Sequence, residues 1–120
     1  MLTLYNYWRS GTSHRVRIAL ALKGLDYSYV PIELTAAAQR EAEFLVRNPQ
    51  GFVPALETDG GETLTQSMAI IEWLEETHPE PPLLPKDAVA RAKVRAIANA
   101  VACDIHPLGN MRVLQYLRKV

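Results

Sequence analysis

The sequence predicts an α/β fold, because strand patterns and helix patterns alternate along its first half. An alternating segment at residues 3–6 precedes a helical pattern at 12–23, and a second alternating segment follows at 27–32. Such alternation is typical of helices packed on a sheet. A run of four of the eight prolines then occupies residues 79–85, beyond which only helical patterns remain. We therefore expect an α/β domain over residues 1–84, followed by the start of an all-helical domain over residues 85–120.

The first three elements predict a βαβ unit. The helix at residues 12–23 repeats apolar residues at helical spacing and is followed by Gly24, which suits a C-cap. Strands joined by such a helix pair in parallel through a right-handed crossover. The Ala- and Glu-rich segment 36–47 then predicts a helix that ends before Asn48-Pro49, because proline disfavours helix in the residue before it.

A hairpin and a third helix are predicted next. Residues 53–56 and 63–65 alternate around the turn at 59–61, which predicts two antiparallel strands. Ser67 is the predicted N-cap of a helix that closes at His78-Pro79. Two more helical segments, 87–102 and 112–120, cannot bury their apolar faces against each other alone. We infer that the chain is the front part of a longer protein, or that it completes itself by oligomerising.

The composition of the chain limits the classes of molecule that it is expected to bind. Thirteen basic and thirteen acidic residues cancel, so we expect no nucleic acid and no membrane as partner. No segment approaches the roughly 20 apolar residues of a membrane span. Cys103 is the single cysteine, which leaves no disulfide, CxxC pair or cysteine zinc site within the chain. We expect a cytoplasmic protein with a small-molecule partner, no bound metal, and a buried structural role for Cys103.

The turn between the first strand and the first helix, residues 8–17, concentrates hydroxyls and cations. Its hydroxyl residues are Ser10, Thr12 and Ser13. At a helix N-terminus the unpaired backbone N–H groups and the helix dipole favour a phosphate, a carboxylate or a thiolate. The same hydroxyls are also good N-caps, and Ser13 is the one we expect to serve only as a cap. The turn thus predicts an anion site.

Taken together, these features resemble the glutathione transferase superfamily. The motifs are the hydroxyls of the first turn, Val53-Pro54 before the third strand and Gln66-Ser67 before the third helix. Tyr7-Trp8-Arg9-Ser10 with residues 15–24 looks like the zeta class, and the resemblance covers essentially all 120 residues. It implies a thioredoxin-like βαβ-ββα domain with a cis bond before Pro54, then the helical C-terminal domain of a glutathione transferase. It also implies a homodimer.

The zeta-class resemblance implies a glutathione-dependent cis–trans isomerase of a maleyl-type acid, maleylacetoacetate or maleylpyruvate, in aromatic compound catabolism. Such a site must lower the pKa of a thiol and hold a substrate carboxylate. The class usually reads Ser-Ser-Cys where this chain has Ser10-Gly11-Thr12, so a hydroxyl replaces the thiol. That turn and residues 103–107 look more like those of the bacterial maleylpyruvate isomerases than like the usual zeta-class pattern. A general transferase acting on small electrophilic acids and a non-catalytic binding module are the alternatives, whereas Thr12 disfavours a glutaredoxin.

The resemblance assigns site residues in both predicted domains. The predicted catalytic residues are Ser10 and Thr12, near the sulfur, and Arg9, whose guanidinium can hold a carboxylate with two hydrogen bonds. The predicted glutathione-binding residues are Ser10, Gly11, Thr12, Gln39, Gln50, Val53, Gln66, Ser67, Asp104, His106 and Asn110. The predicted substrate-binding residues are Arg9, His106 and Arg112.

Each part of glutathione has its expected contacts. The Val53 backbone pairs with the cysteinyl part as an added strand does. Gln66 and Ser67 take the γ-glutamyl carboxylate at a helix N-terminus. The resemblance further places Gln39 and Gln50 near the glycyl end, and Asp104 near the γ-glutamyl amine across a dimer. Arg15 and Arg17 are expected to serve local charge and packing.

Overall fold

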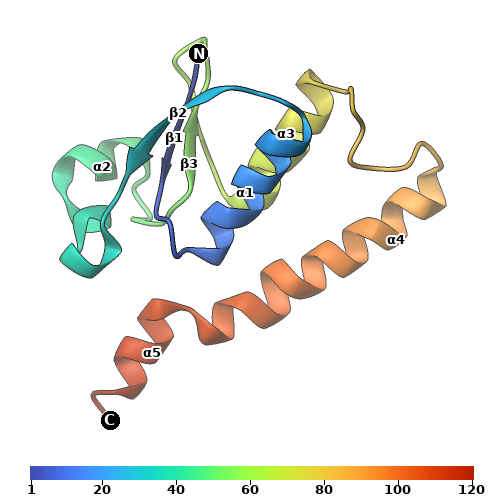
Figure 1. The fold of residues 1–120 in the computed structure, drawn as a ribbon. Helices are drawn as coiled ribbons and strands as arrows, with labels where there is room; N and C mark the ends of the chain where they lie inside the picture. Colours follow the sequence, from blue (N-terminus) through green and yellow to red (C-terminus); the bar gives the residue numbers. More distant parts are fainter. The chain divides into compact units, whose positions relative to one another are not determined.

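A four-stranded mixed sheet organises the first part of the chain (Figure 1). The computed structural model describes all 120 residues, which fall into two units, Met1–Leu83 and Leu84–Val120. The strands are β1 (Leu2–Asn6), β2 (Tyr27–Pro31), β3 (Ala55–Glu57) and β4 (Thr63–Thr65), in the order β2-β1-β3-β4. Strand β1 is parallel to β2 and antiparallel to β3, and β3 is antiparallel to β4. The predicted βαβ-ββα arrangement is confirmed.

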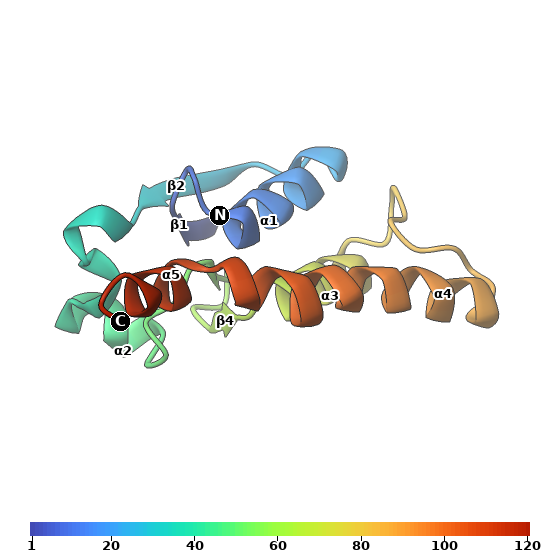
Figure 2. The same ribbon diagram turned by 90° about the horizontal axis from the view of Figure 1, so that it is seen from below.

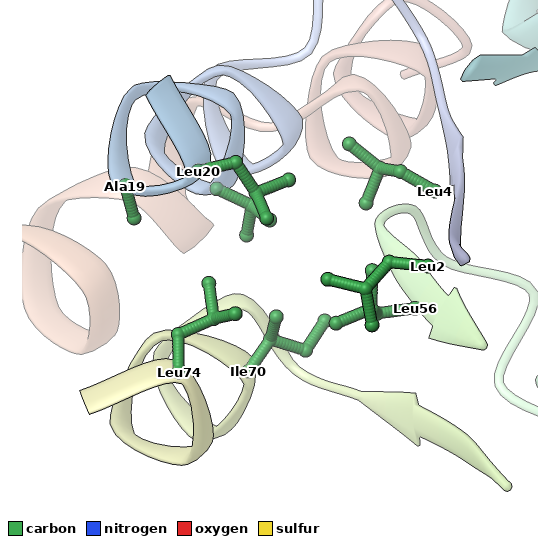
Figure 3. Close-up of a cluster of buried hydrophobic side chains, with 8 residues drawn as sticks. Leu2, Leu4, Ala19, Leu20, Leu56, Ile70 and Leu74 are labelled. Carbon is green, nitrogen blue, oxygen red and sulfur yellow. The ribbon is translucent and has the colours of Figure 1, made fainter. Parts of the chain in front are cut away.

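Helices α1 (Gly11–Leu22) and α3 (Ser67–Thr77) cover one face of this sheet. Leucines of β1 and β3 meet apolar side chains of both helices in one buried cluster (Figure 3). Its members are Leu2, Leu4, Val16, Ala19, Leu20, Leu56, Ile70 and Leu74. Burying each large side chain contributes roughly 1.5–3 kcal/mol. This packing fixes the N-termini of α1 and α3 relative to the strands.

The opposite face carries α2 (Ala42–Arg47), with Phe44 buried against Tyr7, Val53 and Ala55. The single helix predicted over residues 36–47 is wrong. Two short 3₁₀ turns, Leu34–Ala36 and Ala38–Arg40, precede α2. The backbone is left-handed at Ala37 (φ 59°) and extended at Glu41 (ψ 140°), and either conformation interrupts a helical hydrogen-bond ladder.

Helix beginnings differ from the sequence expectations at two positions. Ser10, not Ser13, is the N-cap of α1, and its Oγ accepts from the Ser13 backbone N–H at 3.2 Å. The Ser13 side chain is buried instead, and its Oγ accepts from Tyr7 N at 3.4 Å. Ser67 is the first residue of α3 rather than its cap, a position that Gln66 takes with φ 71°. The predicted cis bond between Val53 and Pro54 is present.

A buried ion pair holds the last residues of the first unit. The Lys23 ammonium lies 3.0 Å from the Glu75 carboxylate and donates to the backbone carbonyls of His78 (2.6 Å) and Pro81 (3.0 Å). The Glu75 carboxylate also accepts from the Leu83 backbone N–H at 2.9 Å. The proline-rich segment is thereby held against the C-terminal ends of α1 and α3.

The regular structure of the second unit is entirely helical, as the sequence predicts. Helix α4 (Ala88–Asn99) continues into a π-helical segment, Ala100–Ile105, and a 3₁₀ turn, His106–Gly109, precedes α5 (Met111–Leu117) (Figure 2). Asp87 caps α4 by accepting from Ala90 N at 2.8 Å. Cys103 is exposed, so the expectation that it is buried is wrong. No helix of the chain is long and apolar enough to cross a membrane.

Candidate functional site

Hydrogen-bonded hydroxyls join the start of α1 to the loop before β3. The Ser10 and Thr12 hydroxyl oxygens lie 2.8 Å apart, and Thr12 Oγ1 donates to the Val53 carbonyl oxygen at 2.9 Å. Ser10 Oγ also accepts from the Ser13 backbone N–H, which satisfies one of the unpaired donors at the helix N-terminus. The structure therefore brings together three predicted site residues that lie up to 43 positions apart in the sequence.

Arg17 holds the backbone of this turn through hydrogen bonds. Its guanidinium donates to Asn6 Oδ1 at 2.7 Å and to the carbonyls of Tyr7 (3.2 Å) and Trp8 (2.9 Å). Asn6 is fully buried at the end of β1. Arg17 thus has the structural role that the sequence predicts for it, and it fixes the path of the chain between β1 and Ser10.

Arg9 lies at the exposed rim of the same turn. Its guanidinium is 5.5 Å from the centre of the Trp8 ring, a cation–π distance. The Trp8 ring in turn lies 6.1 Å from the Tyr7 ring, and its side chain is 65% exposed. An exposed cation supported by an aromatic ring beside the hydroxyls is suited to bind a carboxylate.

The start of α3 carries two more predicted residues. Gln66 has a positive φ of 71°, a backbone conformation that is rare for a residue with a side chain and concentrates at functional sites. Its Nε2 donates to Gln50 Oε1 at 2.9 Å, so these two predicted binding residues meet. Ser67 is buried and its Oγ accepts from Arg15 Nη1 at 3.3 Å, which places a cation next to the helix N-terminus.

Gln39 lies near the loop that carries Gln50 and Gly51. Gly51 has φ 68°, and a Cβ placed there would lie 3.1 Å from the Gln39 carbonyl oxygen. The chain therefore brings Gln39 beside the loop that carries Gln50. The Gln39 Oε1 atom is buried without a hydrogen-bond partner, and such an atom in a native structure requires a functional or structural explanation.

Sequence reasoning missed two residues that shape this loop, Asn48 and Gly51. Asn48 is buried, donates to the Phe52 carbonyl at 2.7 Å and accepts from Gln50 N at 3.1 Å. Gly51 provides the left-handed conformation and the space beside Gln39. The succession Asn-Pro-Gln-Gly is a turn signal that could have indicated both roles.

The remaining predicted residues lie in the second unit. Asp104 is exposed in the π-helical segment, and His106 begins the 3₁₀ turn. Asn110 is the N-cap of α5, because its Oδ1 accepts from the Arg112 backbone N–H at 2.9 Å. The structure thus brings Asn110 and Arg112 together at one helix start, with His106 four residues before Asn110 in the sequence.

The turn after β2 holds a carboxylate with a perturbed pKa. The Thr35 side chain donates to Glu33 Oε1 at 2.6 Å, which lowers the pKa of that carboxyl below its ordinary value. The Thr35 backbone N–H and the Tyr7 side chain act in the same direction, whereas partial desolvation raises this pKa. Glu33 caps the first 3₁₀ turn through the same contacts. Groups of three or more His, Cys, Asp or Glu side chains placed to hold a metal ion are absent.

Comparisons with known proteins identify the family and the fold of this chain. The glutathione S-transferase N-terminal domain family matches residues 1–76. A maleylpyruvate isomerase from Ralstonia sp is 57% identical over 118 residues, which are 98% of this chain and 55% of that protein. A solved maleylpyruvate isomerase described as a bacterial zeta-class glutathione S-transferase superimposes with a TM-score of 0.94 at 56% identity, covering 98% of this chain and 55% of that one.

A second solved structure is a maleylacetoacetate isomerase from Methylobacterium extorquens AM1 with bound malonate and glutathione. It matches with a TM-score of 0.94 at 50% identity, covering 98% of this chain and 55% of that chain. The chain spans about half the length of the curated relatives it matches. The resemblance and the thioredoxin-like fold inferred from the sequence are thereby confirmed.

Proposed function

Because this chain belongs to the glutathione S-transferase family, we propose that it forms the glutathione-binding part of a cis–trans isomerase that acts on a maleyl-type acid. Residues 1–84 are the proposed glutathione-binding domain, and residues 85–120 are the proposed start of the helical domain. The observation that carries the proposal is the hydroxyl pair of Ser10 and Thr12, which joins the start of α1 to Val53. The names of the relatives, maleylpyruvate and maleylacetoacetate isomerase, support the substrate class.

The residues present fit glutathione. The tripeptide offers a thiol, two carboxylates, an ammonium group and two peptide groups, and the first unit carries matching groups. Gln39 has a buried side-chain oxygen without a partner, Gln66 has a strained backbone, and Ser67 lies at the N-terminus of an eleven-residue helix. The backbone of Val53 is the proposed partner of the cysteinyl peptide groups. The other proposed glutathione-binding residues of the first unit are Ser10, Gly11, Thr12 and Gln50. Those of the second unit are Asp104, His106 and Asn110.

Bound glutathione supplies a sulfur nucleophile that can add to an activated double bond and leave again after rotation. Ser10 stands at the N-terminus of α1, where a donated hydrogen bond and the helix dipole both stabilise negative charge. Each unit by which these groups lower a thiol pKa corresponds to about 1.4 kcal/mol. The chain therefore contributes to the reaction by charge stabilisation and by orientation.

The proposed role of Arg9 is to hold a substrate carboxylate. Arg112 and His106 of the second unit are the other proposed substrate-binding residues. A guanidinium can donate two parallel hydrogen bonds to a carboxylate, which fixes its orientation as well as its position. The malonate in the M. extorquens relative supports an acidic substrate. Trp8 supports Arg9 by the ring contact already described.

We further propose a cytoplasmic homodimer that takes part in the breakdown of aromatic compounds. A single cysteine suits a reducing compartment. In the proposed dimer, Asp104 of one subunit reaches the γ-glutamyl amine bound to the other. Sedimentation velocity with and without glutathione measures this association. A glutathione-bound protein that remains monomeric would contradict the dimer.

The proposed activity is tested by following the ultraviolet absorbance of maleylpyruvate and of maleylacetoacetate with and without glutathione. We expect turnover of at least one acid and strict dependence on glutathione. If neither acid reacts, the isomerase proposal fails. Reaction with other small electrophilic acids would then indicate a general transferase. If isothermal titration also shows no heat with glutathione, the family's cofactor site is not functional in this chain.

A further inference from the structure

We propose that Thr12 is a positioning residue that holds the Val53 carbonyl and does not donate to the bound sulfur, which leaves that role to Ser10 alone. The inference rests on the proposed function, because it concerns the same glutathione site. The two hydroxyls appear equivalent in the sequence. Their hydrogen bonds give them different tasks.

The direction of the hydrogen bonds follows from the number of protons. The Val53 carbonyl can only accept, so the single hydroxyl proton of Thr12 lies on the 2.9 Å contact with Val53. In the 2.8 Å contact between the hydroxyls, Ser10 is therefore the donor and Thr12 the acceptor. Ser10 Oγ accepts in turn from the Ser13 backbone N–H. Each hydroxyl donates one hydrogen bond and accepts one.

Redirecting the Ser10 proton is favourable. Turned toward a thiolate, it exchanges a neutral hydrogen bond for a charge-assisted one, which is roughly twice as strong. The cap at Ser13 is unaffected because it uses a lone pair of Ser10, not its proton. Thr12 keeps its own donated bond. One rotation about the Ser10 C–O bond is therefore sufficient to present a donor to the sulfur.

Redirecting the Thr12 proton is unfavourable. Val53 is 8% exposed, and its carbonyl would lose the Thr12 donor in a site with little water to replace it. Thr12 therefore stays on Val53 and ties the first turn of α1 to the loop before β3. A carbonyl oxygen has two lone pairs, so the second one is still available to a strand-pairing peptide N–H. A backbone edge held in place before binding loses less freedom on binding.

The roles are separated by two measurements on the unaltered chain and its variants. The ultraviolet absorbance of the thiolate against pH gives the pKa of bound glutathione, and isothermal titration gives its affinity. Ser10→Ala should raise the thiol pKa by about one unit, which corresponds to ~1.4 kcal/mol, and change affinity little. Thr12→Val should leave the thiol pKa unchanged and weaken affinity by about tenfold. Thr12→Ser keeps the hydroxyl and should restore affinity.

Thr77→Val is the matched control. The Thr77 hydroxyl also donates to a backbone carbonyl, that of Trp73 at 2.8 Å, but at the far end of α3. This variant should change neither quantity. Circular dichroism melting checks folding, and Ser10→Gly serves as a second variant because glycine is tolerated as an N-cap. A rise in thiol pKa with Thr12→Val equal to that with Ser10→Ala, at unchanged affinity, would overturn the inference. Absence of glutathione binding by the unaltered chain would instead overturn the proposed function itself.

Discussion

At the scale of single residues, polar side chains hold backbone groups at the edge of the candidate site. Thr12 holds Val53, Arg17 holds two carbonyls of the first turn, and Asn48 holds the loop that carries Gln50. The exposed groups that remain, among them the Arg9 guanidinium, are therefore the ones to test for substrate recognition.

Replacing Arg9 with lysine should impair substrate use more than glutathione binding. Lysine keeps the positive charge but loses the two parallel hydrogen bonds to a carboxylate. We expect kcat/KM for the maleyl acid to fall about tenfold, or about 1.4 kcal/mol, with the dissociation constant of glutathione nearly unchanged. Steady-state kinetics and isothermal titration measure the two effects. Arg118→Lys, at the C-cap of α5, is the control. Equal losses in both quantities would count against a carboxylate role.

Replacing Thr35 with valine should raise the pKa of Glu33 toward its ordinary value, because the largest cause of its lowering is removed. The pKa of Glu33 is lower in the folded chain than in the unfolded one. Its contribution to stability is therefore present above the unfolded pKa and is lost as the pH falls through the folded pKa. Carbon-13 NMR titration of the Glu33 carboxyl measures the change, with Thr77→Val as the control. An unaltered Glu33 titration in the Thr35 variant would show that the hydroxyl contact is not its cause.

At the scale of elements, the strand and helix order could be predicted because it depends on short-range patterns. The helix expected over residues 36–47 could not, since the left-handed Ala37 depends on how the segment packs rather than on its Ala- and Glu-rich composition. Likewise, the hydroxyls of the first turn were recognisable as candidates, but which of them caps the helix and which contacts Val53 depends on contacts 41 positions away. The glutamines near the loop were placed by resemblance alone.

The buried ion pair between Lys23 and Glu75 gives a prediction at this scale. Lys23→Met removes one charge and leaves the Glu75 carboxylate, 9% exposed, without its cation. We expect the free energy of unfolding to fall by about 3–5 kcal/mol in urea denaturation. The double variant Lys23→Met with Glu75→Leu should recover most of this loss, because no charge is then left buried. If the double variant is as unstable as the single one, the hydrogen bonds to the linker carbonyls are the dominant contribution.

At the scale of the whole molecule, buried apolar side chains are distributed unevenly. Both hydrophobic clusters lie within residues Met1–Leu83, whereas α4, α5 and the segments between them contain no buried residue. The first unit thus has a core of its own. The predicted glutathione-binding residues from Ser10 to Ser67 are carried by that core, and their arrangement depends on it.

The exposed apolar face of α4 predicts association of the 120-residue chain. Val94 and Ile97 of α4 are 40% and 70% exposed, and Val101 of the π-helical segment that continues α4 is 47% exposed. Their spacing of three and four residues places them along one side of the helical segment. Such a stripe favours self-association. Sedimentation velocity should show species larger than a monomer that increase with concentration. Ile97→Glu should shift the distribution toward monomer, whereas Ala92→Glu, on the opposite side of α4, should not. A monomeric chain with a single cooperative thermal transition at high concentration would contradict this expectation.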